Sequence, residues 1–257
     1  MGDSYVESFQ VFERHYFGNI AENILKKDHP NLDFELLNFG RSGYDIADIY
    51  SYQITLVEQF NPDYILYIIS KNDLEPKYSD PLRPKAILEN DRLTISFNFD
   101  SSLIRNYEKS KFFIQNFSLF TMLNNGRKKI NEVSILSILL DKIYTWIISH
   151  SDEIKPFQKL EYKINPVTAK IVETLDPKKV IFVNRDNSEL PLEFKKLYAK
   201  KGFVFIDLSE TLISLKEAGM DPYKWEITGK EGHWNYNAHQ AIGIILAEKI
   251  NGLIVHN

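Results

Sequence analysis

A run of six apolar or aromatic residues without a charge, YILYII at positions 64–69, limits what this chain can fold into more than any other feature. Such a run is typical of a central parallel strand, because helices cover both faces of the sheet in an α/β protein. Segments with helical and strand-like spacing alternate around it. We expect helices over 5–27, 45–60, 166–175, 191–201, 211–218 and 238–250, and strands over 34–39, 64–69, 179–183 and 203–207. The order predicts an α/β fold, a three-layer α/β/α sandwich with a mostly parallel sheet of about five strands.

The alternation is interrupted between residues 75 and 165. A hairpin is expected over 85–97, with its turn at Glu89-Asn90-Asp91, followed by two helices over 101–123 and 130–150. An insertion of about ninety residues is smaller than a typical domain. We therefore expect one domain, residues 1–257, with an insertion at about 75–165 that either caps the functional site or is a peripheral addition.

Composition and charge narrow the classes of function. The net charge is −4 and no basic cluster is interleaved with aromatic residues, so nucleic-acid binding is not expected. The absence of cysteine excludes disulfides, cysteine zinc sites and a cysteine nucleophile. No membrane segment is expected, because the longest apolar stretch, residues 133–148, contains Asp141 and Lys142. Asp73, Asp207 and Glu231 lack metal-ligand spacing with a histidine, so we predict no metal and no cofactor.

Four short polar blocks follow or flank the strand-like runs. In chain order they are Gly2-Asp3-Ser4, NFGRSG at 38–43, SKND at 70–73 and EGHWN at 231–235. Ligands of open α/β sheets bind outside the carboxyl ends of the strands, so the blocks are expected to converge on one edge. Acyl transfer needs a nucleophile, a base with an orienting acid, and donors for an oxyanion. The four blocks contain these residue types.

These blocks, in this order, resemble the SGNH (GDSL-type) hydrolase superfamily, which has a flavodoxin-like α/β fold. The final Gly-His-Trp-Asn, followed by His239, is similar to the branch that includes alginate acetyltransferase-like proteins. The resemblance covers the α/β core and not the insertion. The blocks match in order and in strand context, whereas a Gly-Asp-Ser alone would be weak evidence.

The resemblance implies a role for each matching residue. Ser4 is the expected nucleophile, His233 the general base, and Glu231 the acid that orients the imidazole. The backbone N–H groups of Ser4 and Gly43 and the side-chain amide of Asn72 are the expected oxyanion hole. Asp3 and Asp73 are expected to support the site from the same blocks.

The sequence departs from the family pattern at three places. The third block begins with Ser70 where the family usually has glycine, and the acid is Glu231 where the family usually has aspartate. Only Met1 precedes Gly2, although a nucleophile on a strand-to-helix turn needs a strand before it. We expect that strand to have been lost by truncation or to come from elsewhere, with residues 252–255 as one candidate for its slot. A lost segment would carry any export signal, so the compartment stays open, with the cell envelope as one option.

The expected function is that of a serine esterase that hydrolyses or transfers a small acyl ester. A carbohydrate or polysaccharide carrier is expected by analogy with the family, and the oligomeric state is left open. The alternative is a non-catalytic carbohydrate-binding module on a degenerate SGNH fold. The residues also have structural alternatives: Ser4 as a helix N-cap with Glu7 completing a capping box, Asn72 and Asp73 as turn formers, and His233 as a surface loop residue.

Overall fold

The computed structural model describes residues 1–77, 83–96 and 164–255. All of them except Arg83 belong to one compact unit, formed by residues 1–79, 84–97 and 162–257. The second unit comprises residues 80–83 and 98–161. The two helices expected over 101–123 and 130–150 lie outside the described residues.

Three parallel strands form the central sheet, in the order β1-β4-β5. They are β1 (Ile65–Ile69), β4 (Val180–Asn184) and β5 (Val204–Asp207). Ile65 pairs with Val180, and Ile181 pairs with Val204. The α/β fold with a parallel sheet is therefore confirmed, and three of the predicted strands form within one or two residues of their expected bounds. The described residues contain three parallel strands, whereas about five were expected.

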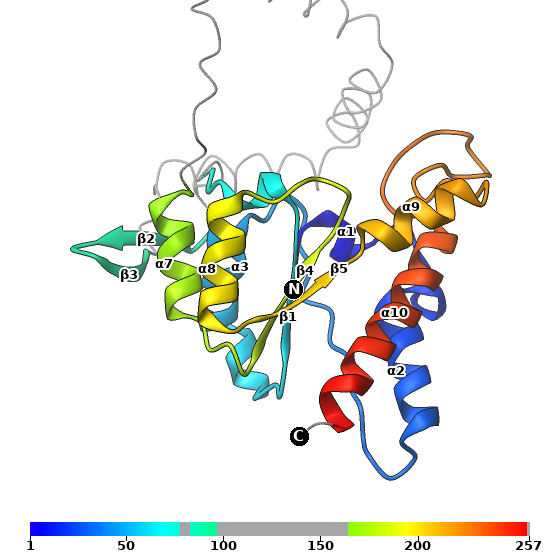
Figure 1. Ribbon diagram of the computed structural model, residues 1–257, viewed down its shortest axis with the longest axis horizontal. Coiled ribbons are helices and arrows are strands. Elements are labelled where there is room, and N and C mark those ends of the chain that lie inside the picture. The colour runs from blue at the N-terminus through cyan, green and yellow to red at the C-terminus, as the bar shows by residue number, and fades with distance from the viewer. Residues whose placement is uncertain (78–82, 97–163, 256–257) are drawn as a thin grey trace, which may run out of the picture. The chain divides into compact units, whose positions relative to one another are not determined.

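Helices lie on both faces of this sheet (Figure 1). One face is covered by α3 (Ile46–Thr55), α7 (Pro166–Thr174) and α8 (Leu192–Lys201), and the other by α2 (Phe17–Asp28) and α10 (Tyr236–Val255), with α9 (Ser209–Glu217) beside α10. Alternate strand residues enter the two cores because a strand has a period of two. Tyr67 and Phe182 are buried against the first set of helices, and Ile68 and Ile181 against the second.

Local signals set the ends of several helices. The Asp45 carboxylate accepts hydrogen bonds from the N–H groups of Ala47 (3.0 Å) and Asp48 (3.2 Å), which caps the start of α3. Asn165 caps α7 in the same way, ahead of a proline at the first helical position. Gly202 ends α8 with a φ of 80°, a left-handed conformation that costs glycine little.

The predicted hairpin is confirmed. Strands β2 (Lys85–Glu89) and β3 (Arg92–Ser96) pair antiparallel. Asn90 and Asp91 both have positive φ, as a two-residue turn between twisted strands requires. Ala86 is fully buried in the core that α3 and α7 cover.

The single helix expected over residues 5–27 is wrong. The segment forms α1 (Ser4–Glu7), a 3-10 turn η1 (Glu13–His15) and then α2. Ser8 ends α1 in the left-handed region, with its hydroxyl donating to the Tyr5 carbonyl. Phe9 and Phe12, which fit the helical spacing, are 86% and 65% exposed. The apolar residues keep a helical spacing on both sides of Ser8, although the backbone ends the helix there. The spacing alone therefore predicted one helix in place of two.

The strand expected over 34–39 does not form either. Gly2 makes parallel bridges with both Gly40 and Ile68, so Met1 and Gly2 lie between this segment and β1. A strand needs a neighbour along its length for its ladder of hydrogen bonds. Here the neighbour contributes only two residues, and the pairing is confined to Gly40. The tail at 252–255, which was a candidate for this slot, instead continues α10.

Gly40 brings the second polar block against α1. A Cβ at this position would lie 2.2 Å from the Glu7 nitrogen and 2.5 Å from the Val6 carbonyl carbon. Because these are backbone atoms, Gly40→Ala is expected to lower the free energy of unfolding by about 1–3 kcal/mol in urea unfolding. Gly252→Ala is the matched control: it lies in α10 with no atom within 4 Å of a new Cβ, and it should gain up to about 1 kcal/mol. A Gly40→Ala protein as stable as the parent would contradict the close approach.

Candidate active site

The structure brings the first and the last polar block together at Ser4 and His233. The Ser4 Oγ lies 2.7 Å from the His233 Nε2, across 229 residues of sequence. This is a normal hydrogen-bond distance for these atoms. Both side chains are half-buried, so solvent and a small substrate can reach them. A serine hydroxyl on an imidazole nitrogen is the pairing that an activated nucleophile needs.

Ser4 is the first residue of α1, and Asp3 caps that helix. The Asp3 carboxylate accepts from the Tyr5 N–H at 3.0 Å, and the Asp3 carbonyl accepts from the N–H groups of Val6 and Glu7. The capping box suggested for Ser4 and Glu7 is therefore wrong. Because Asp3 takes the capping role, the Ser4 hydroxyl is left to face His233.

The second polar block lies against the nucleophile turn. Asn38 donates from its side-chain amide to the Val6 carbonyl at 2.8 Å, and the Arg41 N–H donates to the Gly2 carbonyl at 2.9 Å. Both the N–H and the hydroxyl of Ser42 donate to the Glu7 carboxylate. Gly43 follows, exposed and with a φ of 74°. The block thus converges on the turn that carries Ser4, as the sequence predicts.

The loop before α10 holds His233 through its backbone. The Trp225 indole N–H donates to the His233 carbonyl at 3.0 Å. Asn235 is buried, and its amide donates to the carbonyls of Asp221 (2.7 Å) and Lys224 (2.8 Å). These bonds close the loop, so the imidazole is presented to Ser4 from a fixed backbone.

Aromatic packing holds the ring itself. The Tyr5 ring centroid lies 4.4 Å from that of His233 and 5.3 Å from that of Trp234. Trp234 is completely buried, so it packs in the core beneath the site. Tyr5 follows the nucleophile directly, so α1 positions both the hydroxyl and the ring that contacts the base.

Glu231 lies on the loop before α10, two residues ahead of His233. It is exposed and forms an antiparallel bridge with Lys224. Among the described residues, no hydrogen bond joins its carboxylate to the imidazole. Its role as the orienting acid stays a prediction.

A buried arginine that sequence reasoning missed lies next to the nucleophile. Arg185 directly follows β4 and forms an ion pair with Asp3, with a second nitrogen–oxygen distance of 3.6 Å to Asp73. Its other terminal nitrogen donates to the Ser70 hydroxyl at 2.8 Å. The guanidinium carbon lies 4.3 Å from the centroid of the Tyr5 ring. The signal was the position of Arg185 at the carboxyl end of a predicted strand, where ligand-binding residues gather.

Arg185 also accounts for the serine in the third block. The Ser70 N–H and hydroxyl both donate to the Asp73 carboxylate, at 2.8 and 2.9 Å. Burial raises the pKa of Asp73, and the positive charge of Arg185 opposes that rise. A glycine in place of Ser70 would lack the hydroxyl that joins the carboxylate to the guanidinium. Asp73 is thus part of a buried network and of the turn η3 (Lys71–Leu74), while Asn72 is exposed on that turn.

His239 is structural, in line with its position at a helix start. It is fully buried in α10, and its Nδ1 accepts from the Phe17 N–H at 3.2 Å. Burial lowers its pKa to about 4. The imidazole therefore stays neutral in the folded chain at neutral pH, and it joins α2 to α10.

This burial makes stability depend on pH. The unfolded chain binds a proton at His239 near pH 6.5, whereas the folded chain binds it only near pH 4. Stability is therefore unaffected above pH 6.5 and is lost as the pH falls towards 4, by about 3 kcal/mol in total. We expect the stability difference between the parent and His239→Gln to shrink by this amount between pH 7 and pH 4, measured by urea unfolding. A difference that does not change with pH would contradict the neutral, buried imidazole.

The described residues contain neither a candidate metal site nor a candidate membrane-spanning helix. Within them, no three His, Cys, Asp or Glu side chains are grouped to hold a metal ion. None of the helices in the described ranges combines the length and apolar composition that crossing a bilayer requires. Comparison of the chain with protein-family models, with curated proteins and with solved structures gave no match.

Proposed function

We propose that this chain is an SGNH-type serine esterase that hydrolyses, or transfers, a small acyl ester. The observation that carries the proposal is the 2.7 Å contact between the Ser4 hydroxyl and the His233 Nε2. Ser4 belongs to the first polar block and His233 to the last, and the sequence pattern assigns them the roles of nucleophile and base. They are 229 residues apart, so only the tertiary structure brings them into contact. A carbohydrate carrier for the acyl group rests on the family resemblance.

The reaction follows from this geometry. The Ser4 Oγ attacks the ester carbonyl carbon while His233 Nε2 takes its proton, which gives a tetrahedral intermediate. When this intermediate collapses, the alcohol leaves with the proton from His233, and the acyl group stays on Ser4. Water, or a sugar hydroxyl, then attacks the acyl carbon and gives its proton to His233. The bond between the acyl carbon and the Ser4 Oγ breaks, His233 returns the proton to Ser4, and the carboxylic acid or the new ester is released.

The oxyanion would be stabilised at the start of α1. Ser4 is the first helical residue, a position whose backbone N–H has no intrahelical acceptor. The Gly43 N–H and the Asn72 amide are the further donors that the resemblance implies. Each donor of this kind is worth about 2.7–4 kcal/mol of barrier.

The buried network keeps the nucleophile turn in place. Arg185 holds Asp3, and Asp3 caps the helix that begins at Ser4. Tyr5 lies between Arg185 and His233 in direct contact with both. Arg185 is therefore a positioning residue, because it acts on Ser4 and His233 through Asp3 and Tyr5.

Labelling with a fluorophosphonate probe tests the proposal directly. We expect the folded chain to gain one adduct, which peptide mass spectrometry would assign to Ser4. Ser4→Ala should take up none, and the heat-unfolded chain should take up none because its serine lacks the base. A folded chain that neither reacts with the probe nor hydrolyses p-nitrophenyl acetate would contradict the proposal and favour the carbohydrate-binding module.

A further inference from the structure

The imidazole of His233 is hydrogen-bonded to the nucleophile through one of its two nitrogens. Its Nε2 lies 2.7 Å from the Ser4 Oγ. Within residues 1–77, 83–96 and 164–255, no hydrogen bond joins a side chain to the other nitrogen, Nδ1. In a Ser-His-acid triad a carboxylate binds that nitrogen, which fixes the ring and stabilises the imidazolium ion. The orientation of the His233 ring here depends on other contacts.

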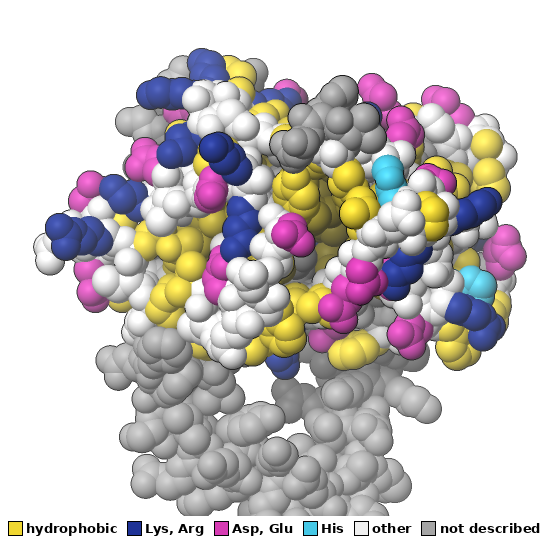
Figure 2. Space-filling view, turned by 90° about the horizontal axis from the view of Figure 1, so that it is seen from below, with side chains coloured by type: hydrophobic (Ala, Val, Ile, Leu, Met, Phe, Trp, Pro, Cys, Tyr) yellow, Lys and Arg dark blue, Asp and Glu magenta, His cyan; other side chains and the backbone are white. Residues whose placement is uncertain are grey.

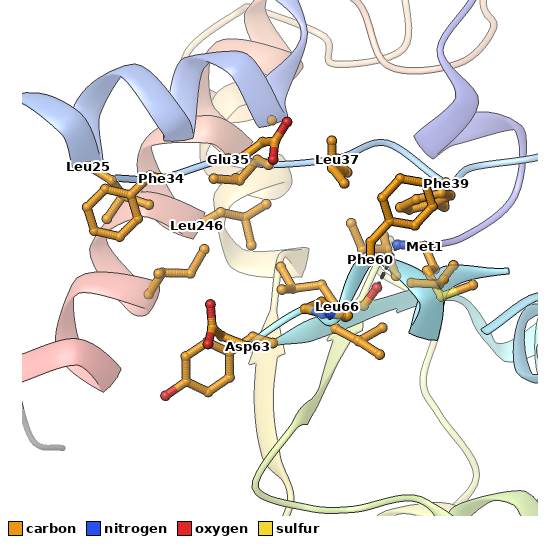
Figure 3. A pocket seen from close by; sticks show the side chains of 18 of the residues that line it. Met1, Leu25, Phe34, Glu35, Leu37, Phe39, Phe60, Asp63, Leu66 and Leu246 are labelled. Atoms are coloured by element: carbon orange, nitrogen blue, oxygen red, sulfur yellow. Dashed lines mark hydrogen bonds between the residues drawn. The ribbon is translucent and has the colours of Figure 1, made fainter. Parts of the chain in front are cut away.

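The largest apolar hollow of the described residues does not supply those contacts. It is a groove of about 800 Å³ whose lining includes residues 32–37. Figure 2 shows a hollow lined by hydrophobic side chains on the face of the molecule that it draws, and Figure 3 shows Leu25 and Phe60 among the side chains of the groove. Neither Ser4 nor His233 belongs to the lining. The contacts that hold the imidazole are therefore those of its own loop and of α1.

Tyr5 makes the closest ring contact with the imidazole. The two ring centroids are 4.4 Å apart, and the ring planes meet at 46°. The Tyr5 ring also packs edge-on against Trp234, at 5.3 Å and 73°, and Trp234 is completely buried. Tyr5 is thus fixed against the core by the residue that follows His233. Because Tyr5 also follows Ser4, the short helix α1 sets the positions of the hydroxyl and of the ring together.

Arg185 supports the Tyr5 ring independently of His233. The guanidinium carbon lies 4.3 Å from the Tyr5 ring centroid, within the range of a cation–π contact. Burial raises the pKa of the Tyr5 hydroxyl, so the phenol stays neutral at neutral pH. Tyr5 therefore acts on His233 as a neutral aromatic ring, and the part of Tyr5 that matters for this contact is the ring itself.

The charges around Arg185 do not oppose a positive charge at the site. One guanidinium faces three carboxylates, and these belong to Asp3, Asp73 and Asp186. Burial raises the pKa of Asp73, which favours its protonated form. Even with Asp73 neutral, two carboxylates face the one guanidinium. The cluster therefore adds no net positive charge next to the imidazole.

We propose that Tyr5, and not Glu231, is the positioning residue that orients His233, so that Ser4 and His233 act as a dyad. This inference rests on the proposed esterase function. As the Ser4 Oγ bonds to the ester carbonyl carbon, its proton moves to the His233 Nε2 and the ring becomes an imidazolium ion. An aromatic ring attracts a cation more strongly than a neutral group, so the Tyr5 contact strengthens as the proton arrives.

Steady-state hydrolysis of p-nitrophenyl acetate by three variants tests the inference. Tyr5→Leu removes the ring, and we expect it to lower kcat about 10²-fold while KM stays within about twofold, because a small displacement of the base costs this much. Tyr5→Phe keeps the ring and should recover most of kcat. An acid that orients the base of a triad is worth about 10⁴-fold in kcat, whereas Glu231→Gln should lose at most about tenfold.

Three results would overturn the inference. They are a Tyr5→Leu variant that keeps the kcat of the parent, a Tyr5→Phe variant as slow as Tyr5→Leu, and a Glu231→Gln loss as large as that of Tyr5→Leu. The last two of these need no change to an aliphatic side chain, so they decide the question even where Tyr5→Leu lowers stability.

Nuclear magnetic resonance of the imidazole gives a readout that activity does not. In a chain labelled at histidine, the carbon-bound ring protons of His233 are shifted by the ring current of Tyr5. We expect Tyr5→Leu to move these signals towards those of an exposed histidine and Tyr5→Phe to leave them in place. His239, buried in α10, is the internal reference for folding. His233 signals that are the same in Tyr5→Leu and in the parent would contradict the contact.

The parent chain separates this inference from the esterase proposal. A parent that neither hydrolyses the ester nor reacts with the fluorophosphonate probe would overturn both. An active parent whose Tyr5→Leu variant is equally active would overturn the positioning role of Tyr5 and leave the esterase proposal standing.

Discussion

Replacing His233 by alanine is expected to lower kcat/KM for p-nitrophenyl acetate at least about 10³-fold, and Ser4→Ala is expected to do the same. The two side chains form one unit through their 2.7 Å contact, in which the hydroxyl reacts only when the imidazole takes its proton. The double variant should therefore lose little beyond either single variant. Steady-state hydrolysis, with folding checked by circular dichroism, measures all three.

His29 provides a control for the substitution of His233, because it is a histidine outside the candidate active site. The His29 Nε2 donates a hydrogen bond to the Asn251 Oδ1 (2.6 Å), and among the described residues no hydrogen bond joins His29 to Ser4 or His233. His29→Ala should hydrolyse the ester at the parent rate. If Ser4→Ala and His233→Ala reduced the rate by multiplicative factors, or not at all, the two residues would not act as nucleophile and base.

Replacing Arg185 by methionine is expected to lower the free energy of unfolding by about 3–5 kcal/mol, measured in urea. Arg185 is 7% exposed, and its removal leaves the carboxylates of half-buried Asp3 and buried Asp73 without their counter-ion. Burial already raises the pKa of Asp73, so the loss of stability should become smaller as the pH falls below neutral and this carboxyl is neutralised by a proton.

Two comparisons distinguish this buried pairing from an ordinary ion pair. Lys195 pairs with Glu189 at the surface, at 3.5 Å, and Lys195→Met should cost at most about 1 kcal/mol. In Arg185→Met combined with Asp73→Asn, one unpaired charge is gone, so the double variant should be more stable than the sum of the single losses predicts. An Arg185→Met protein that loses under 1 kcal/mol would contradict the network.

Arg185→Lys tests positioning as distinct from folding. Lysine keeps the charge but lacks the planar fork that reaches Asp3 and Ser70 together and stacks on Tyr5. We expect this variant to recover most of the stability that methionine loses. If Arg185 acts on the nucleophile turn, kcat should stay several-fold low while KM changes little, and full recovery of kcat would restrict Arg185 to stability.

The sequence alone determined those features that depend on neighbours along the chain. The run at 64–69 and the apolar run before Asn184 become buried strands, because a continuous apolar run is stable only where both faces are covered, and the run before Asp207 becomes a partly buried strand. The helix beginning at Ile46 follows from the carboxylate of Asp45, and the hairpin from the turn at Asn90 and Asp91. The sequence also identified Ser4 and His233 as candidates, since residue type and block order were sufficient for that.

Tertiary structure decided whatever depends on partners far away in the chain. The strand at 34–39 fails because its ladder partner spans only Met1 and Gly2. The role of Arg185 also depends on a distant partner, because Asp3, with which it forms an ion pair, is 182 residues away. An ion pair, a sheet ladder or a nucleophile–base contact exists only when the fold brings both groups within a few ångströms, because hydrogen bonds and buried charge pairing act at short range.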